Sequence, residues 1–202
     1  PTEEFLESEW ELKDLKEGGY EAAEFYDGGW EPQALLENDV FSLEELCEAE
    51  WPAESMREAE IEVASLKEAG STALQLKDGG YSAADLRKGE FTAEELREAE
   101  FSAEEMHEAE FEPSELKEAE WPIEELLEVY PLGELRAGGY AAREMKQAGA
   151  GAGQLREAGY EGAEVSEDYG VEDLRGGGYE VEDLADRFRP QELKDGGFEA
   201  KE

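Results

Sequence analysis

The search for reactive side chains begins with His107 and Cys47, because the chain has only one residue of each type. A protein zinc site takes about four ligands, and a Cys/His catalytic pair needs a third group that orients the histidine. The sequence offers neither set beside these two residues. We therefore interpret His107 as a solvated side chain and Cys47 as a partly exposed thiol with no assigned role.

Carboxylates are abundant, with 57 Asp and Glu residues in 202. A glycosidase-type pair requires two particular carboxyl groups in different environments, whereas these acids recur in equivalent places. Calcium accepts oxygen ligands in loose geometry, but the patterned loop of an EF-hand is absent. We predict a non-enzymatic protein without catalytic, cofactor-binding or metal-binding residues, for which weak binding of divalent cations is the interaction that the composition permits.

The glycine-rich stretch at 149–153 is the one segment that invites comparison with a phosphate-binding loop. It lacks the glycine spacing of a dinucleotide loop, and the chain has no Gly-Lys-Ser/Thr sequence for a P-loop. Close packing of backbone or local flexibility is the interpretation that we adopt for these glycines.

The chain is instead organised as ten-residue units, most of which begin with an aromatic residue at position 1. Position 6 is apolar throughout, and position 7 carries most of the basic residues. Acids gather at positions 4, 5, 8 and 10, while position 9 is mostly Ala or Gly. We predict that positions 1 and 6 form the core, as represented by Phe91, Leu96, Phe101, Met106, Phe111, Leu116, Trp121 and Leu126.

This column order predicts a short helix and a turn in every unit. Position 2 supplies the N-cap, as in Ser42, Ser82, Thr92 and Ser102, and an acid or Gln at position 5 completes a capping box. Pro32, Pro113 and Pro190 fall at position 3, the first helical residue, where proline costs no hydrogen bond.

Gly at position 10 indicates a left-handed residue that ends the helix, and the aromatic residue that follows would pack on position 6 of both flanking helices. Helical periodicity places positions 3, 6 and 10 on one side and positions 4, 5 and 8 away from it. Many central units have Glu at position 10, where a left-handed conformation is strained, so we expect the units at 41–120 to turn differently.

The predicted fold is therefore all-α, an elongated solenoid of about 19 helix-turn units, because helices this short need neighbours for stability. We assign 1–9 to an irregular N-terminal segment and 10–202 to a single solenoid, most regular at 41–120 and glycine-rich at 130–198. Apolar residues also recur every five positions, which resembles the pentapeptide-repeat family and its right-handed β-solenoid. That alternative would bury the charges of position 4, and disorder is the other alternative.

Units such as YSAADLRKGE and FTAEELREAE also resemble the decapeptide repeats with the pattern [FY]-[ST]-A-x-E-L-[KR]-x-A-G that occur in low-complexity proteins. The resemblance covers nearly the whole chain. It implies a repeat-built fold and carries over no activity.

The formal net charge of -39 disfavours direct binding to nucleic acid or to an anionic membrane surface, and no apolar run is long enough to span a membrane. We expect a soluble protein, although no compartment or oligomeric state is indicated.

The leading hypothesis is a structural or interaction scaffold, a linker or binding subunit of a larger complex with a basic surface, for example a photosynthetic assembly. Exposed position 1 edges and a basic stripe would make the contacts, and the stripe comprises Arg57, Lys67, Lys77, Arg87, Arg97 and Lys117. The alternatives are an acidic calcium-binding, counterion-binding or mineral-associated protein and, third, a nucleic-acid mimic.

Overall fold

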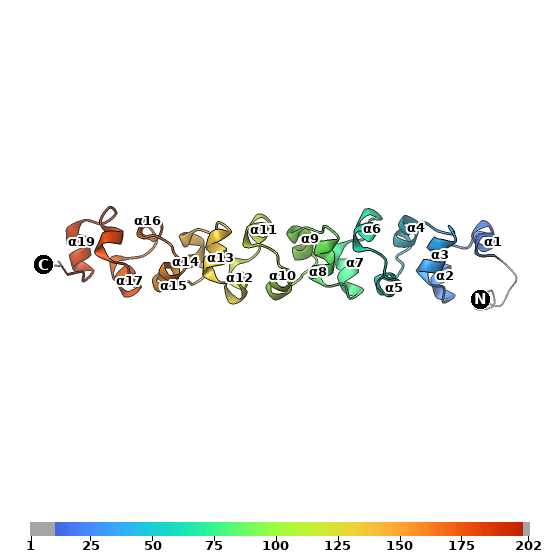
Figure 1. Ribbon diagram of the computed structural model, residues 1–202, viewed down its shortest axis with the longest axis horizontal. Helices are drawn as coiled ribbons and strands as arrows, with labels where there is room; N and C mark the ends of the chain where they lie inside the picture. Colours follow the sequence, from blue (N-terminus) through green and yellow to red (C-terminus); the bar gives the residue numbers. More distant parts are fainter. Residues whose placement is uncertain (1–10, 200–202) are drawn as a thin grey trace. The chain divides into compact units, whose positions relative to one another are not determined.

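The computed structural model describes residues 11–199, and within them the chain is all-α (Figure 1). The described residues have no β-strand, so the β-solenoid alternative is wrong. The assigned irregular segment at 1–9 lies outside the described residues. The nineteen helices of the described part are α1 (Leu12–Glu17), α2 (Ala22–Asp27), α3 (Pro32–Glu37), α4 (Leu43–Glu48), α5 (Ala53–Glu58), α6 (Val63–Glu68), α7 (Ala73–Asp78), α8 (Ala83–Lys88), α9 (Ala93–Glu98), α10 (Ala103–Glu108), α11 (Pro113–Glu118), α12 (Ile123–Val129), α13 (Leu132–Ala137), α14 (Ala142–Gln147), α15 (Ala152–Glu157), α16 (Gly162–Val165), α17 (Val171–Gly176), α18 (Val181–Leu184) and α19 (Pro190–Asp195).

The helices begin where the sequence predicts. The hydroxyl groups of Ser42, Ser82, Thr92 and Ser102 accept a hydrogen bond from the backbone N–H at position 5, and the side chain at position 5 accepts one from the N-cap N–H. Helices α3, α11 and α19 begin at their prolines. The capping boxes matter because a six-residue helix has few internal hydrogen bonds and would not persist alone.

The ten-residue units end in Schellman turns. After α9 the N–H of Phe101 donates to the carbonyl of Leu96 at 3.1 Å, and the N–H of Glu100 donates to that of Arg97 at 2.9 Å. The same two bonds occur where position 10 is Gly, for example at Gly80 and Tyr81. The turn therefore places the position 1 ring directly after the helix that it caps.

The expected difference between Glu-ended and Gly-ended units is wrong. Glutamates at position 10 adopt the left-handed conformation with φ of 54–63°, and the corresponding glycines have φ of 79–96°. The Schellman hydrogen bonds and the burial of the next ring outweigh a strain of about 1–2 kcal/mol per residue. Position 10 is also exposed rather than on the apolar side, because the left-handed residue turns its side chain out of the helix, and position 9 is buried in its place in units such as those of Ala99 and Ala109.

Nine-residue units lack the left-handed residue altogether. The N–H groups of Tyr130, Tyr169 and Phe188 donate to carbonyls four residues earlier, those of Leu126, Val165 and Leu184, instead of five. In the single eleven-residue interval Val40 takes the place of the ring in the Schellman turn, and both Val40 and Phe41 are buried. A deletion or insertion in the turn thus leaves the apolar side of the helix in register.

The described residues belong to two compact units, residues 1–109 and 110–202. Within each unit a helix packs on the helix two places along the chain. In the first unit α5 contacts α7, α6 contacts α8 and α8 contacts α10, and in the second α11 contacts α13 and α15 contacts α17. One coil of the solenoid in each unit therefore takes two repeats.

Small residues at position 9 make this packing possible. A Cβ built on Gly89 would lie 2.4 Å from Cγ1 of Val63, and one on Gly138 would lie 2.6 Å from Cβ of Pro113. Both neighbours occupy position 3 two repeats earlier. Close approach also explains part of the glycine-rich stretch, because Gly153 packs on Gly177, while Gly149 is a left-handed turn residue.

Candidate functional site

All eight residues that we assigned to the repeat core are buried, and those at position 6 are fully so. The rings at position 1 are buried too, from Phe91 at 4% exposure to Trp121 at 5%. Exposed position 1 edges are therefore the wrong expectation for these units. Each of these rings is enclosed by the solenoid, and a partner cannot reach it as a surface edge.

The basic stripe is directed toward the solenoid itself. The guanidinium of Arg57 donates to the carbonyl of Gly79 at 3.0 Å, and that of Arg87 donates to the carbonyl of Ala109 at 2.8 Å. Equivalent bonds join Lys67 to Glu90, Lys77 to Glu100 and Lys117 to Gly139. Each acceptor follows the helix two repeats later, so the cation neutralises the negative end of that helix dipole.

The same cations also contact rings and carboxylates. Lys67 lies 4.5 Å from the ring centroid of Phe91 and 2.8 Å from the carboxylate of Glu95. Lys117 has the same pair of partners in Tyr140 and Glu144. These contacts between distant repeats were not recognised in the sequence, and contact of the stripe with a partner stays a prediction.

Position 5 acids thus have two roles, N-capping and pairing with a cation. Burial of Glu95 favours its neutral form, but hydrogen bonds from Lys67 and from the backbone of Thr92 outweigh this and lower its pKa. Burial has the same effect on Glu144, where hydrogen bonds from the Ala141 N–H and from Lys117 outweigh it and lower the pKa. These carboxylates are ionised parts of the framework.

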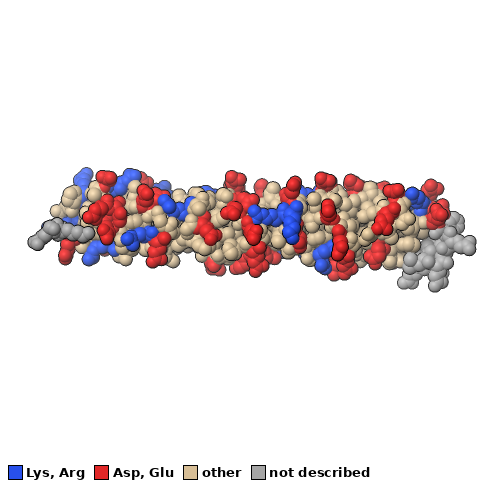
Figure 2. All heavy atoms as spheres, in the orientation of Figure 1, with Lys and Arg blue, Asp and Glu red and all other residues tan. Residues whose placement is uncertain are grey.

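Acids at positions 4, 8 and 10 form what we call the acidic face. Glu94, Glu98, Glu104 and Glu108 are exposed on α9 and α10, and acidic side chains occur along the visible face of each compact unit (Figure 2). Among the described residues no three His, Cys, Asp or Glu side chains lie close enough to hold a metal ion.

His107 and Cys47 lie in the position 7 column, as expected from the sequence. His107 is exposed on α10, and Cys47 is a half-buried free thiol on α4. The hydroxyl of Ser71 donates to the Cys47 sulfur at 3.3 Å, a contact between position 1 and position 7 that no sequence motif indicated.

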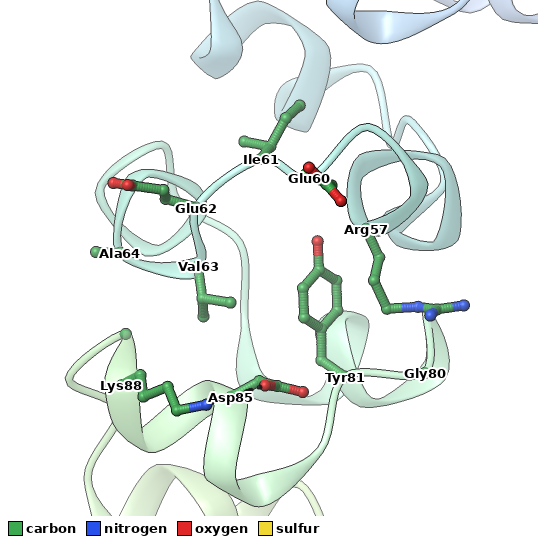
Figure 3. Close-up of a pocket in the computed structure, with 11 residues that line it drawn as sticks. Arg57, Glu60, Ile61, Glu62, Val63, Ala64, Gly80, Tyr81, Asp85 and Lys88 are labelled. Atoms are coloured by element: carbon green, nitrogen blue, oxygen red, sulfur yellow. Dashed lines mark ion pairs between the residues drawn. The ribbon is translucent and has the colours of Figure 1, made fainter.

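A cavity of about 570 Å³ opens beside Tyr81, between α6 and α8 (Figure 3). The Tyr81 side chain points into it between Arg57 and Val63, and Asp85 lies beside the base of the Tyr81 side chain. Tyr81 is only 6% exposed, and its hydroxyl is buried without a hydrogen-bond partner among the described residues. In several other units the tyrosine hydroxyl instead donates to the position 1 carbonyl two repeats earlier, as Tyr160 does to Tyr140 at 2.6 Å.

Burial raises the pKa of Tyr81 to about 12, although the charge of Arg57 opposes the shift. The phenol therefore stays protonated near neutral pH, where it can donate a hydrogen bond but cannot act as a general base.

No described helix is long and apolar enough to cross a membrane. Comparisons with curated proteins and with solved structures find no match for this chain. Residues 70–130, which include the most regular units, match the model of the family described as the decapeptide repeat region. This stretch of the chain is therefore similar to that family, in keeping with the resemblance of its units to decapeptide repeats.

Proposed function

We propose that this protein is a non-enzymatic scaffold whose acidic face binds a basic surface of a protein partner, as a linker or binding subunit of a larger assembly. The observation that carries the proposal is the inward direction of the position 7 cations. Lys67, Lys77 and Lys117 donate hydrogen bonds to carbonyls at helix ends, and Lys67 and Lys117 also pair with position 5 carboxylates.

The consequence is a segregation of charge. Position 7 cations contact other parts of the solenoid, and the exposed carboxylates at positions 4, 8 and 10 face solvent at intervals set by the ten-residue unit. Like charges held on a stable framework create a negative potential that attracts cationic surfaces and accelerates their association. A basic protein gains the most from such a surface because its own charges are then neutralised along the array.

The test begins with native isolation of the protein and identification of its partners by mass spectrometry. Binding of a recovered basic partner is then measured against a variant in which Glu94, Glu98, Glu104 and Glu108 are changed to Gln. We expect the affinity at low salt to fall at least tenfold and its salt dependence to become shallower.

The matched control changes the same four residues to Asp, which preserves charge and should leave affinity within about threefold. Equal weakening by the Gln and Asp variants would contradict the electrostatic proposal. Saturable, calcium-specific stabilisation at equal ionic strength would favour the ion-binding alternative instead, because a ligand bound only by the folded state raises the melting temperature.

A further inference from the structure

The units at 61–70 and 71–80 depart from the repeat at position 1, where Ile61 and Ser71 replace an aromatic residue. At Ser71 two residues depart from the repeat, the position 1 ring and the position 7 cation that would lie over it. In other units a position 7 cation lies over the position 1 ring that follows the helix two repeats later, as Lys77 does over Phe101 at 4.5 Å. Here both members change together, and Cys47 contacts Ser71 instead.

A cavity of about 330 Å³ adjoins both replaced residues, Ser71 and Cys47. Leu66 and Leu76, which occupy position 6 before and after Ser71, line the cavity together with Trp51, Met56 and Cys47. In the other units, a position 1 ring packs against the position 6 side chains of the helices before and after it. The cavity therefore lies where this chain elsewhere places an aromatic side chain.

The repeat also indicates which ring would fit. Tyr130 donates its hydroxyl hydrogen bond to the carbonyl of Phe111 at 2.9 Å, and Tyr179 donates to that of Tyr160 at 2.9 Å. Both acceptors belong to position 1 two repeats earlier. For a ring beside Ser71 the corresponding acceptor is the carbonyl of Trp51.

A second, independent observation concerns Trp51 itself. Its side chain is buried, with 6% of the residue exposed, and the indole N–H has no hydrogen-bond partner among the described residues. A buried donor left unpaired costs about 1–3 kcal/mol, so a bound oxygen atom that accepts this hydrogen bond is favoured. A hydroxyl group can serve both needs, as donor to a carbonyl and as acceptor from an N–H.

We propose that this cavity is a binding site for a phenolic ring, either a free small phenol or the side chain of a tyrosine in another polypeptide. Leu66, Leu76 and Met56 supply the apolar walls, and Trp51 supplies the polar contacts for the hydroxyl. Cys47 leaves room that a lysine would fill, and its polarisable sulfur packs favourably against a ring. Glu50 and Asp78, two acids of the acidic face, also line this cavity.

The test uses the full chain and p-cresol, the side-chain analogue of tyrosine. We expect p-cresol to bind saturably, to raise the melting temperature and to change the tryptophan fluorescence of the chain. Toluene has the same ring without the hydroxyl, and we expect it to bind about tenfold more weakly. N-acetyltyrosinamide distinguishes the two sources, because its binding requires a site open enough for a polypeptide-borne ring, whereas binding of p-cresol alone indicates a free phenol.

Ser71→Tyr supplies the missing ring covalently, so we expect it to raise the melting temperature and to abolish p-cresol binding. Ser114→Tyr places the same side chain at an exposed position in α11 and should leave p-cresol binding unchanged. The proposal is overturned if p-cresol shows no saturable binding to the natural chain, or if it binds equally well after Ser71→Tyr. Calorimetry on the natural chain decides the matter even where the Ser71 variant fails to fold.

Discussion

The left-handed glutamates give a prediction whose sign depends on one backbone angle. Glu100 is exposed and has φ of 59°, and its N–H and carbonyl are hydrogen-bonded to Arg97 and Lys77. The left-handed conformation costs a non-glycine residue about 1–2 kcal/mol, which glycine does not incur. Glycine loses about 0.5–1 kcal/mol more chain entropy on folding. Glu100→Gly should therefore stabilise the fold by about 0.5–1 kcal/mol.

Glu98→Gly is the matched control. Glu98 is also exposed and lies close by in the same unit, but it is the last residue of α9 and has helical geometry. Both variants remove one carboxylate from the acidic face, so the relief of charge repulsion is similar. The control should destabilise the fold by about 0.5–1 kcal/mol because glycine is a poor helix former.

Urea titration followed by far-UV circular dichroism measures both changes as shifts of the unfolding midpoint at constant slope. We expect shifts of opposite direction for the two variants. If Glu100→Gly lowers the midpoint as much as Glu98→Gly does, then position 10 does not adopt the left-handed conformation and our account of the Schellman turn fails.

Three further predictions concern packing and charge. Gly89→Ala should destabilise the fold by about 1–3 kcal/mol, because the new Cβ would lie 2.4 Å from Cγ1 of Val63. In a double-mutant cycle measured by urea titration, Val63→Ala should reduce that cost, and additive effects of the two substitutions would refute the contact. Burial raises the pKa of Tyr81 and Tyr179 to about 12, so the folded state holds their protons more firmly than the unfolded state. The stabilisation that these two protonated tyrosines contribute is complete below about pH 10 and is lost toward pH 12. Absorbance at 295 nm should therefore show that they ionise late and together with unfolding. Simple ionisation of all tyrosines near pH 10 would contradict their burial. Lys77→Met should destabilise by about 1 kcal/mol, less so at high salt, because the end of α9 and the carbonyl of Glu100 lose a charged donor, and an unchanged melting temperature at low salt would argue against this role.

Local structure was predictable from the sequence because its signals lie within one unit. Ser102 and Glu105 are three positions apart and form the capping box that their types indicate. Gly80 likewise marks a left-handed turn by its identity. At Glu100 the same reasoning failed, since the residue type argues against a conformation that the surrounding hydrogen bonds impose.

Contacts between repeats two units apart were not predicted, because an apolar stripe that recurs in every unit does not specify which distant neighbour it meets. Two pairs of residues nevertheless carry that information. Val63 is larger than the usual Ala, and Gly89, in the unit two repeats later, is correspondingly smaller. Cys47 and Ser71 depart from the repeat together, and their side chains are in contact. Such paired exceptions indicate the two-repeat coil, and the site beside Ser71 follows from the same reasoning.

The central claim is that position 7 cations are directed inward, onto the turn that follows two repeats later. A nuclear Overhauser spectrum of the natural chain with labelled Lys and Phe tests it most directly at Lys77, whose ammonium lies 4.5 Å from the ring centroid of Phe101. We predict strong cross-peaks between the Lys77 side-chain methylene protons and the Phe101 ring protons, together with upfield-shifted lysine resonances. A Lys77 side chain with random-coil shifts and no cross-peaks to Phe101 would contradict the claim.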